Sequence, residues 1–134
     1  MSVRVLIADD NEMVRRGIKD LLASEMTWQI CGEATDGADA VQKSRELRPH
    51  IILLDISMPQ LNGLQAARLL RKDSPEVKIL VMSQHDPVQL LPRVIEAGAN
   101  GCIDKSRIGV DLLPAIRSID GITERSHPDR NAAD

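Results

Sequence analysis

Short apolar runs alternate with helical patterns along most of this chain, and this alternation constrains its fold more than any other feature. Five runs have the aliphatic, β-branched character of buried strands: 3–8, 28–34, 50–55, 77–82 and 101–103. Between them, apolar residues recur at helical spacing over segments of about 10–15 residues. Strands that alternate with helices of this length predict βαβ units, and therefore a parallel sheet covered by helices on both faces.

We therefore predict an α/β fold of the doubly wound class, with a five-stranded parallel sheet in the order 2-1-3-4-5 and five helices. The run at 28–34 alternates between apolar and polar residues, so we place it near the edge of the sheet. The folded domain is expected to cover residues 1–120. Residues 121–134 are polar and are predicted to form a disordered tail or a truncated linker.

The composition is ordinary for a globular domain and argues against several kinds of function. The formal net charge of −3 argues weakly against direct binding of nucleic acid. No apolar stretch approaches the roughly 20 residues that span a bilayer, and the first strand leaves no room for a signal peptide. Cys31 and Cys102 lack the spacing of metal ligands, so we expect both to be reduced and buried in a cytoplasmic protein.

Polar side chains stand at the carboxyl ends of four predicted strands. Asp9 and Asp10 follow the first strand and Asp55 ends the third, while Ser83 and Lys105 follow the fourth and fifth. Because the carboxyl ends of parallel strands meet at one edge of a sheet, where ligands bind, we expect these side chains to converge.

Three converging carboxylates call for a cation. Two carboxylates about 5 Å apart repel each other by a few kcal/mol at an effective dielectric constant near 20. Mg²⁺ relieves such repulsion and suits one or two carboxylates together with water and a phosphoryl oxygen. Asp55 would then stay ionised and could attack phosphorus, while Lys105 and the Ser83 hydroxyl could stabilise the phosphoryl oxygens.

The ordered set of strand-end residues resembles the receiver domain of two-component response regulators, the CheY-like family, whose fold is flavodoxin-like. The resemblance covers about residues 3–120. The residues that carry it are Asp9, Asp10, Asp55, Pro59, Gly63, Ser83 and Lys105.

This resemblance implies a role for each site residue. Asp55 would be the phospho-acceptor, and Asp10 and Asp55 would bind Mg²⁺ directly with help from the main-chain carbonyl of Ser57. Asp9 would act mostly through water. Lys105 would bind the phosphoryl group, and Ser83 would be the switch hydroxyl.

The resemblance also implies partners. The phosphoryl donor would be a phosphohistidine on a sensor histidine kinase, and the chain would be a signalling phospho-acceptor rather than an enzyme. The surface of the fourth helix, fifth strand and fifth helix would control an output domain or a partner protein. Residues 57–59 and 96–99 are similar to receivers that precede a helix-turn-helix domain, which implies transcription regulation. A weak homodimer is a further family expectation.

Two departures from the family pattern concern the switch and the fourth helix. The family usually has Tyr or Phe three residues before the lysine, where this chain has Cys102. A thiol is smaller than an aromatic ring and cannot swing between an inward and an outward position as the ring does. Switching must therefore use another part of the structure. Pro92 would lie inside the fourth helix at a cost of about 3 kcal/mol, so we expect a kink or a late start near Leu91. Pro114 is expected at the third helical position after Asp111 as N-cap, where no donor is lost.

Three other functions stay open at this point. A receiver-like module could signal through protein contacts without phosphorylation, although retention of the site residues argues against it. A phosphohydrolase with an aspartate nucleophile usually needs a second Asp two residues later, and that position is Ser57. A nucleotide-binding module ranks last, because no glycine-rich phosphate loop follows the first strand.

Overall fold

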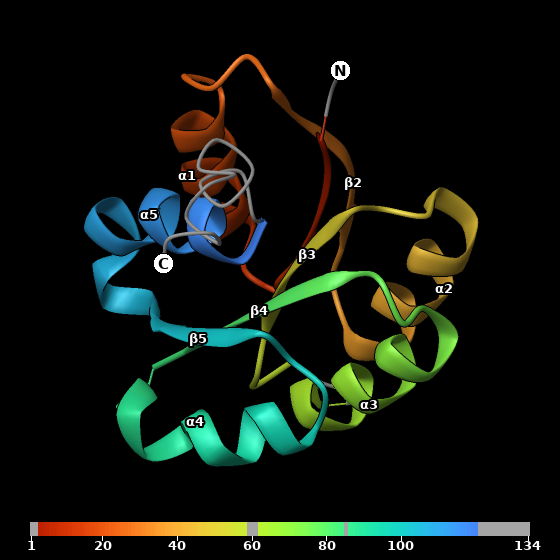
Figure 1. Cartoon of the computed structure of the whole chain (residues 1–134). Helices are drawn as coiled ribbons and strands as arrows, with labels where there is room; N and C mark the ends of the chain where they lie inside the picture. Colours follow the sequence, from red (N-terminus) through yellow and green to blue (C-terminus); the bar gives the residue numbers. More distant parts are fainter. Residues whose placement is uncertain (1–2, 59–61, 85, 121–134) are drawn as a thin grey trace, which may run out of the picture.

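Five parallel strands form the centre of the molecule, and helices cover both faces of the sheet (Figure 1). The structure is a computed structural model that describes residues 3–58, 62–84 and 86–120. The strands are β1 (Val3–Ala8), β2 (Trp28–Ala34), β3 (Ile51–Asp55), β4 (Lys78–Ser83) and β5 (Gly101–Asp104). Their order is β2-β1-β3-β4-β5, which confirms the predicted order and the edge position of β2.

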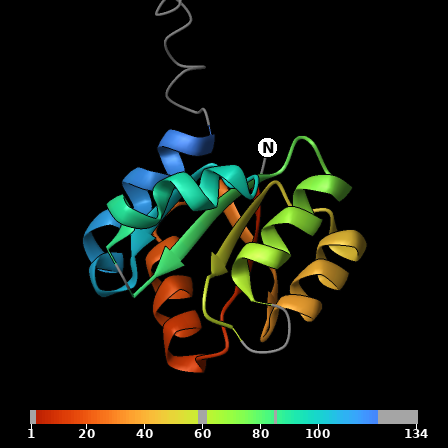
Figure 2. The same ribbon diagram turned by 90° about the horizontal axis from the view of Figure 1, so that it is seen from below.

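Two helices pack on one face of the sheet and three on the other (Figures 1 and 2). The helices are α1 (Glu12–Leu22), α2 (Gly37–Leu47), α3 (Gly63–Asp73), α4 (Pro87–Glu96) and α5 (Ile108–Asp120). A short 3₁₀ turn, η1 (Lys105–Arg107), joins β5 to α5. Helices α1 and α5 share one face, and α2, α3 and α4 share the other, as expected for a doubly wound sheet.

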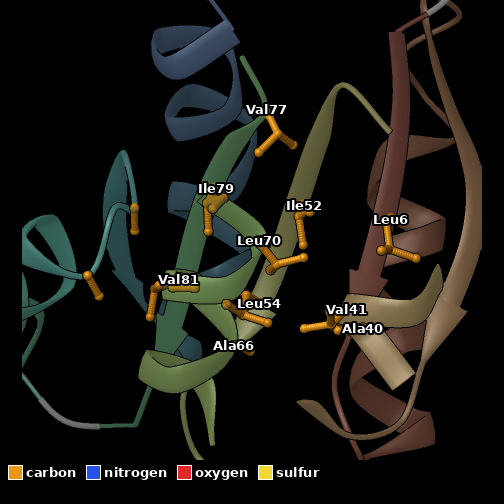
Figure 3. Packing of buried hydrophobic residues seen from close by; sticks show 14 of the residues in the cluster. Leu6, Ala40, Val41, Ile52, Leu54, Ala66, Leu70, Val77, Ile79 and Val81 are labelled. Atoms are coloured by element: carbon orange, nitrogen blue, oxygen red, sulfur yellow. The ribbon is translucent and has the colours of Figure 1, made fainter. Parts of the chain in front are cut away.

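Aliphatic side chains fill both layers of the core, since the chain contains no Phe or Tyr. On the face covered by α2, α3 and α4, Leu6, Ile52 and Leu54 of the sheet meet Val41 and Leu70 (Figure 3). The next residues along the same strands point to the other face, so β3 is buried along its whole length. Full burial of one such side chain stabilises the fold by about 1.5–3 kcal/mol.

Side-chain caps fix where α1, α2, α3 and α4 begin. Their N-caps are Asn11, Asp36, Asn62 and Asp86, and each side chain accepts a hydrogen bond from a main-chain N–H of the first turn. Asn62 and Gln65 also form a reciprocal capping box. Such caps supply acceptors for the N–H groups that a helix leaves unpaired at its start.

Helix α4 corrects one prediction. It begins at Pro87, with the Asp86 side chain accepting from the Val88 N–H at 2.9 Å, so the expected late start near Leu91 is wrong. Pro92 lies inside the helix on its exposed face. Water can therefore reach the carbonyl that the proline leaves without an N–H partner, which lowers the cost of keeping it there. The expected kink stays a prediction.

Helix α5 corrects a second prediction. It begins at Ile108, so Asp111 is not its N-cap and Pro114 lies in the helix interior. The reason is local, because η1 runs directly into the helix and moves its first residue from the expected Leu112 to Ile108. Asp111 instead accepts a hydrogen bond from Arg107 Nε at 3.1 Å.

Among the described residues, no helix is both long and apolar enough to cross a membrane. The predicted tail at 121–134 and the motif residue Pro59 lie outside the described residues.

Candidate functional site

Three aspartates meet at the carboxyl edge of the sheet, as predicted. Asp9 and Asp10 follow β1, and Asp55 is the last residue of β3. One carboxylate oxygen from each lies within 4.8 Å of the others. The Asp9 and Asp55 side chains are buried, whereas Asp10 is exposed and opens the cluster to solvent.

Lys105 brings a positive charge into this cluster from the end of β5. Its Nζ lies 2.8 Å from Asp9 Oδ2 and 3.4 Å from Asp55 Oδ2, and its side chain is only 9% exposed. Burial lowers the pKa of Lys105, but the two carboxylates outweigh burial and raise that pKa above its ordinary value. The side chain is therefore a firmly protonated ammonium.

Burial disfavours the charged form of the Asp9 carboxyl group. Burial raises its pKa, and the nearby Asp55 charge adds to this rise, against the opposing effects of Lys105 and of the Asn11 N–H. The Asn11 N–H donates to Asp9 Oδ1 at 2.8 Å. Asp9 Oδ2 is buried and meets the Lys105 ammonium at 2.8 Å.

The donor set fits a hard divalent cation. Carboxylate oxygens of Asp9, Asp10 and Asp55 lie within 4.8 Å of one another, and they are the oxygen ligands that Mg²⁺ prefers. One ammonium compensates only part of three negative charges. A divalent cation would remove the remaining repulsion.

The loop after β3 orients Asp55 through its own backbone. The Ser57 N–H donates to Asp55 Oδ1 at 3.1 Å, and the Ser57 hydroxyl lies 3.3 Å from the same oxygen. Gly63 begins α3 against this loop, where a Cβ would lie 2.4 Å from Ile56 Cα and 2.7 Å from the Asp55 carbonyl oxygen. Only glycine fits there without moving the backbone. The metal-binding role of the Ser57 carbonyl stays a prediction.

Ser83 lies on β4, the strand beside Asp55, and Cys102 lies on β5, the next strand toward the edge of the sheet. Ser83 ends β4, is fully buried and pairs in register with Asp104. Cys102 pairs with Val81, so it stands two residues behind the edge that bears Ser83. The Cys102 thiol is only half-buried, where full burial was expected, and it packs against the core cluster beneath α2, α3 and α4. Burial, with the charge of Asp104, raises its pKa to about 11, so the thiol is protonated at neutral pH.

Sequence reasoning missed two charged residues behind the cluster. Arg15 of α1 donates to the main-chain carbonyl of Asp9, and it also pairs with Glu33 near the end of β2. The available signal was a charged residue within the apolar pattern of α1, together with an acid at the carboxyl end of the neighbouring strand.

Comparison with known proteins shows the family of this chain. Residues 5–117 match the family model described as the response regulator receiver domain. The transcriptional regulatory protein DegU of Brevibacillus brevis is 34% identical over 117 residues, which are 87% of this chain and 50% of that protein. The response regulator GacA of Pseudomonas viridiflava is also 34% identical, over 87% of this chain and 55% of its own length. The chain thus spans about half the length of these relatives.

Solved structures share the fold of this chain. A two-component response regulator of the LuxR family from Aurantimonas sp. SI85-9A1 superposes with a TM-score of 0.83 and 29% identity, covering 90% of this chain and 86% of that one. The response regulator domain of Thermotoga maritima CheB gives a TM-score of 0.81 and 30% identity, covering 90% and 97%. On the family match and this shared architecture, the chain belongs to the response regulator receiver domain family of two-component systems.

Proposed function

We propose that this receiver accepts a phosphoryl group on Asp55 from the phosphohistidine of a sensor histidine kinase. One observation supports this role above the others. The carboxylates of Asp9, Asp10 and Asp55 lie within 4.8 Å of one another, with the Lys105 ammonium 3.4 Å from Asp55. Exposed acidic groups need no such neighbour, whereas an attacking carboxylate needs both a cation and a charge for the incoming oxygens.

The proposed metal site uses the acidic cluster. Asp10 and Asp55 would bind Mg²⁺ directly, with the Ser57 main-chain carbonyl, while Asp9 would act through water. When bound, Mg²⁺ supplies positive charge that neutralises the phosphoryl oxygens and keeps the carboxylates ionised. Asp10 is the exposed member of the set, so it is the natural first contact for an incoming ion.

The protein residues divide the chemistry among them. An Asp55 carboxylate oxygen forms the new bond to phosphorus as the bond to the donor nitrogen breaks, and that electron pair stays on the nitrogen. Lys105 then shares its positive charge with the phosphoryl oxygens, and the Ser83 hydroxyl donates to them as the switch. The chain thus takes part in its own phosphorylation and dephosphorylation without being an enzyme.

The phosphorylated receiver would act through the surface of α4, β5 and α5. Helix α4 buries only Val94 and leaves Val88, Leu91 and Ile95 between 41% and 77% exposed, which suits a face that meets another protein. We propose an output domain or partner protein here, a role in transcription regulation in the cytoplasm, and a weak homodimer. Direct binding of nucleic acid by this chain is not part of the proposal.

Intact mass spectrometry tests the proposal. The chain is incubated with acetyl phosphate in the presence and absence of Mg²⁺, alongside Asp55→Asn and the matched control Asp73→Asn at the opposite edge of the sheet. We expect wild type and Asp73→Asn to gain one phosphoryl group only with Mg²⁺, and Asp55→Asn to gain none. Wild type that binds Mg²⁺ but gains no phosphoryl group would contradict the proposal and favour signalling without phosphorylation.

A further inference from the structure

The guanidinium of Arg15 binds the backbone of the loop after β1, which carries Asp9 and Asp10. Arg15 Nη1 donates to the main-chain carbonyl of Asp9 at 2.8 Å, and Arg15 Nε donates to Glu33 Oε1 at 2.8 Å. The Arg15 side chain is only 14% exposed. A single planar group therefore joins the loop after β1 to the end of β2, with a separate nitrogen for each acceptor.

Glu33 is also held by two lysines, Lys19 of α1 and Lys43 of α2. Lys19 Nζ lies 2.8 Å from Glu33 Oε2, and Lys43 Nζ of α2 donates to the Glu33 main-chain carbonyl at 2.6 Å. The hydrogen bonds from Lys19 and Arg15 hold the pKa of Glu33 below its ordinary value. Arg15 thus rests against an ionised carboxylate that offsets its charge.

The bond from Arg15 completes the restraint of Asp9. The Asp9 N–H donates to the Ala34 carbonyl at 3.0 Å, and Asp9 Oδ1 accepts from the Asn11 N–H at 2.8 Å. The carbonyl that Arg15 holds belongs to the peptide group joining Asp9 to Asp10. Its orientation therefore sets the direction in which Asp10 leaves the strand.

We propose that Arg15, braced by Glu33, is a positioning residue that sets the Mg²⁺ affinity of the receiver by fixing the peptide between Asp9 and Asp10. This inference rests on the proposed function, since it assumes that the acidic cluster binds Mg²⁺. Groups behind metal ligands orient those ligands, and their loss typically weakens metal binding about 10–100-fold. Arg15 acts on the cluster through its hydrogen bond to the main-chain carbonyl of Asp9 rather than through a carboxylate.

The direction of the effect separates positioning from simple electrostatics. Arg15→Gln removes a positive charge close to a cation site, so charge alone would tighten Mg²⁺ binding. Loss of positioning would weaken it instead. Arg16→Gln removes the same charge from the next residue, whose side chain is 65% exposed and lies 3.9 Å from Glu12.

The experiment is titration calorimetry of Mg²⁺ into the full chain, with thermal unfolding of each variant to confirm its fold. We expect about tenfold weaker binding for Arg15→Gln and a change within about twofold for Arg16→Gln. Arg15→Lys keeps the charge but replaces the planar fork of nitrogens with one ammonium, so we expect weaker binding here too. This variant keeps the test decisive if Arg15→Gln fails to fold.

The outcomes separate this inference from the proposed function. Folded Arg15 variants that bind Mg²⁺ as tightly as wild type, or more tightly, would overturn the inference alone. A wild-type chain that binds no Mg²⁺ would overturn the proposed function and this inference with it. Weaker binding by Arg15→Gln and Arg15→Lys, with Arg16→Gln unchanged, would support both.

Discussion

Both edges of the sheet carry acids and cations, but they hold them in different ways. At the amino edge, a cleft of about 560 Å³ is lined by residues that include Arg45, His50, Asp73 and Glu76. Its ion pair, Arg45 Nε to Asp73 Oδ2 at 2.6 Å, involves an arginine that is 58% exposed. At the carboxyl edge, Asp9, Asp55 and Lys105 are almost fully buried.

The difference shows where the fold accepts an electrostatic cost. Exposed ion pairs are solvated whether or not they form, so they change stability little. Buried carboxylates that outnumber their cations destabilise the folded chain unless a ligand compensates them. The molecule concentrates that cost at one edge, where the proposed cation and phosphoryl group would relieve it.

The largest expected difference between the two edges is in the unfolding free energy lost when a cation is removed. Lys105→Met keeps most of the side-chain volume but leaves Asp9 and Asp55 without their ammonium. We expect a loss of roughly 3 kcal/mol of unfolding free energy without Mg²⁺, at the lower end of the range for broken buried pairs because Asp10 opens the site to solvent. Urea unfolding measures it, with Arg45→Met at the amino edge as the control that should change little. Equal losses of unfolding free energy from the two variants would show that the two edges do not differ in this way.

The next effect is on phosphorylation. Asp10→Asn removes one proposed metal ligand, and we expect phosphorylation by acetyl phosphate to slow about a hundredfold, since metal stabilisation of the phosphoryl oxygens is worth several kcal/mol. Asp73→Asn at the opposite edge should react at the wild-type rate. The measurement is the time course of intact mass at fixed Mg²⁺. An Asp10→Asn chain that reacts as fast as wild type would exclude this residue from the site.

A smaller effect should appear in the pH dependence of stability. Burial raises the pKa of Asp9 above its unfolded value. The stability that this group contributes is therefore fully present below the unfolded pKa of about 4 and is lost as pH rises through the folded pKa. As the pH rises from acidic to neutral without Mg²⁺, we expect the unfolding free energy of Asp9→Asn to increase relative to that of wild type. Denaturant unfolding across this pH range measures the difference between the two proteins. A difference that instead grows in favour of Asp9→Asn as the pH falls would contradict the prediction.

Much of the fold was predictable because burial on both faces leaves a plain sequence pattern. The aliphatic run from Ile51 to Leu54 is typical of a central strand that is buried on both faces. Its place in the sheet follows from the βαβ connections. The meeting of Asp9, Asp10 and Asp55 was predictable for the same reason, since parallel strands bring their carboxyl ends to one edge.

The missed features depend on register and on solvent. Glu33 meets Arg15 because β1 and β2 pair with Ile7 opposite Glu33, after a register shift between Val5 and Leu6 that no sequence pattern reveals. The starts of α4 and α5 were misplaced because both interior prolines, Pro92 and Pro114, lie on exposed helix faces. Propensity alone treats such positions as costly, whereas water can satisfy the carbonyls they leave unpaired.

The most direct test of the central claim is to locate the phosphoryl group. The chain is phosphorylated with acetyl phosphate and Mg²⁺, reduced with borohydride to convert an aspartyl phosphate into homoserine, and mapped by peptide mass spectrometry. The buried cluster at the carboxyl edge predicts homoserine at position 55 and at no other aspartate. Homoserine at Asp73 or another exposed acid, with position 55 unchanged, would contradict it.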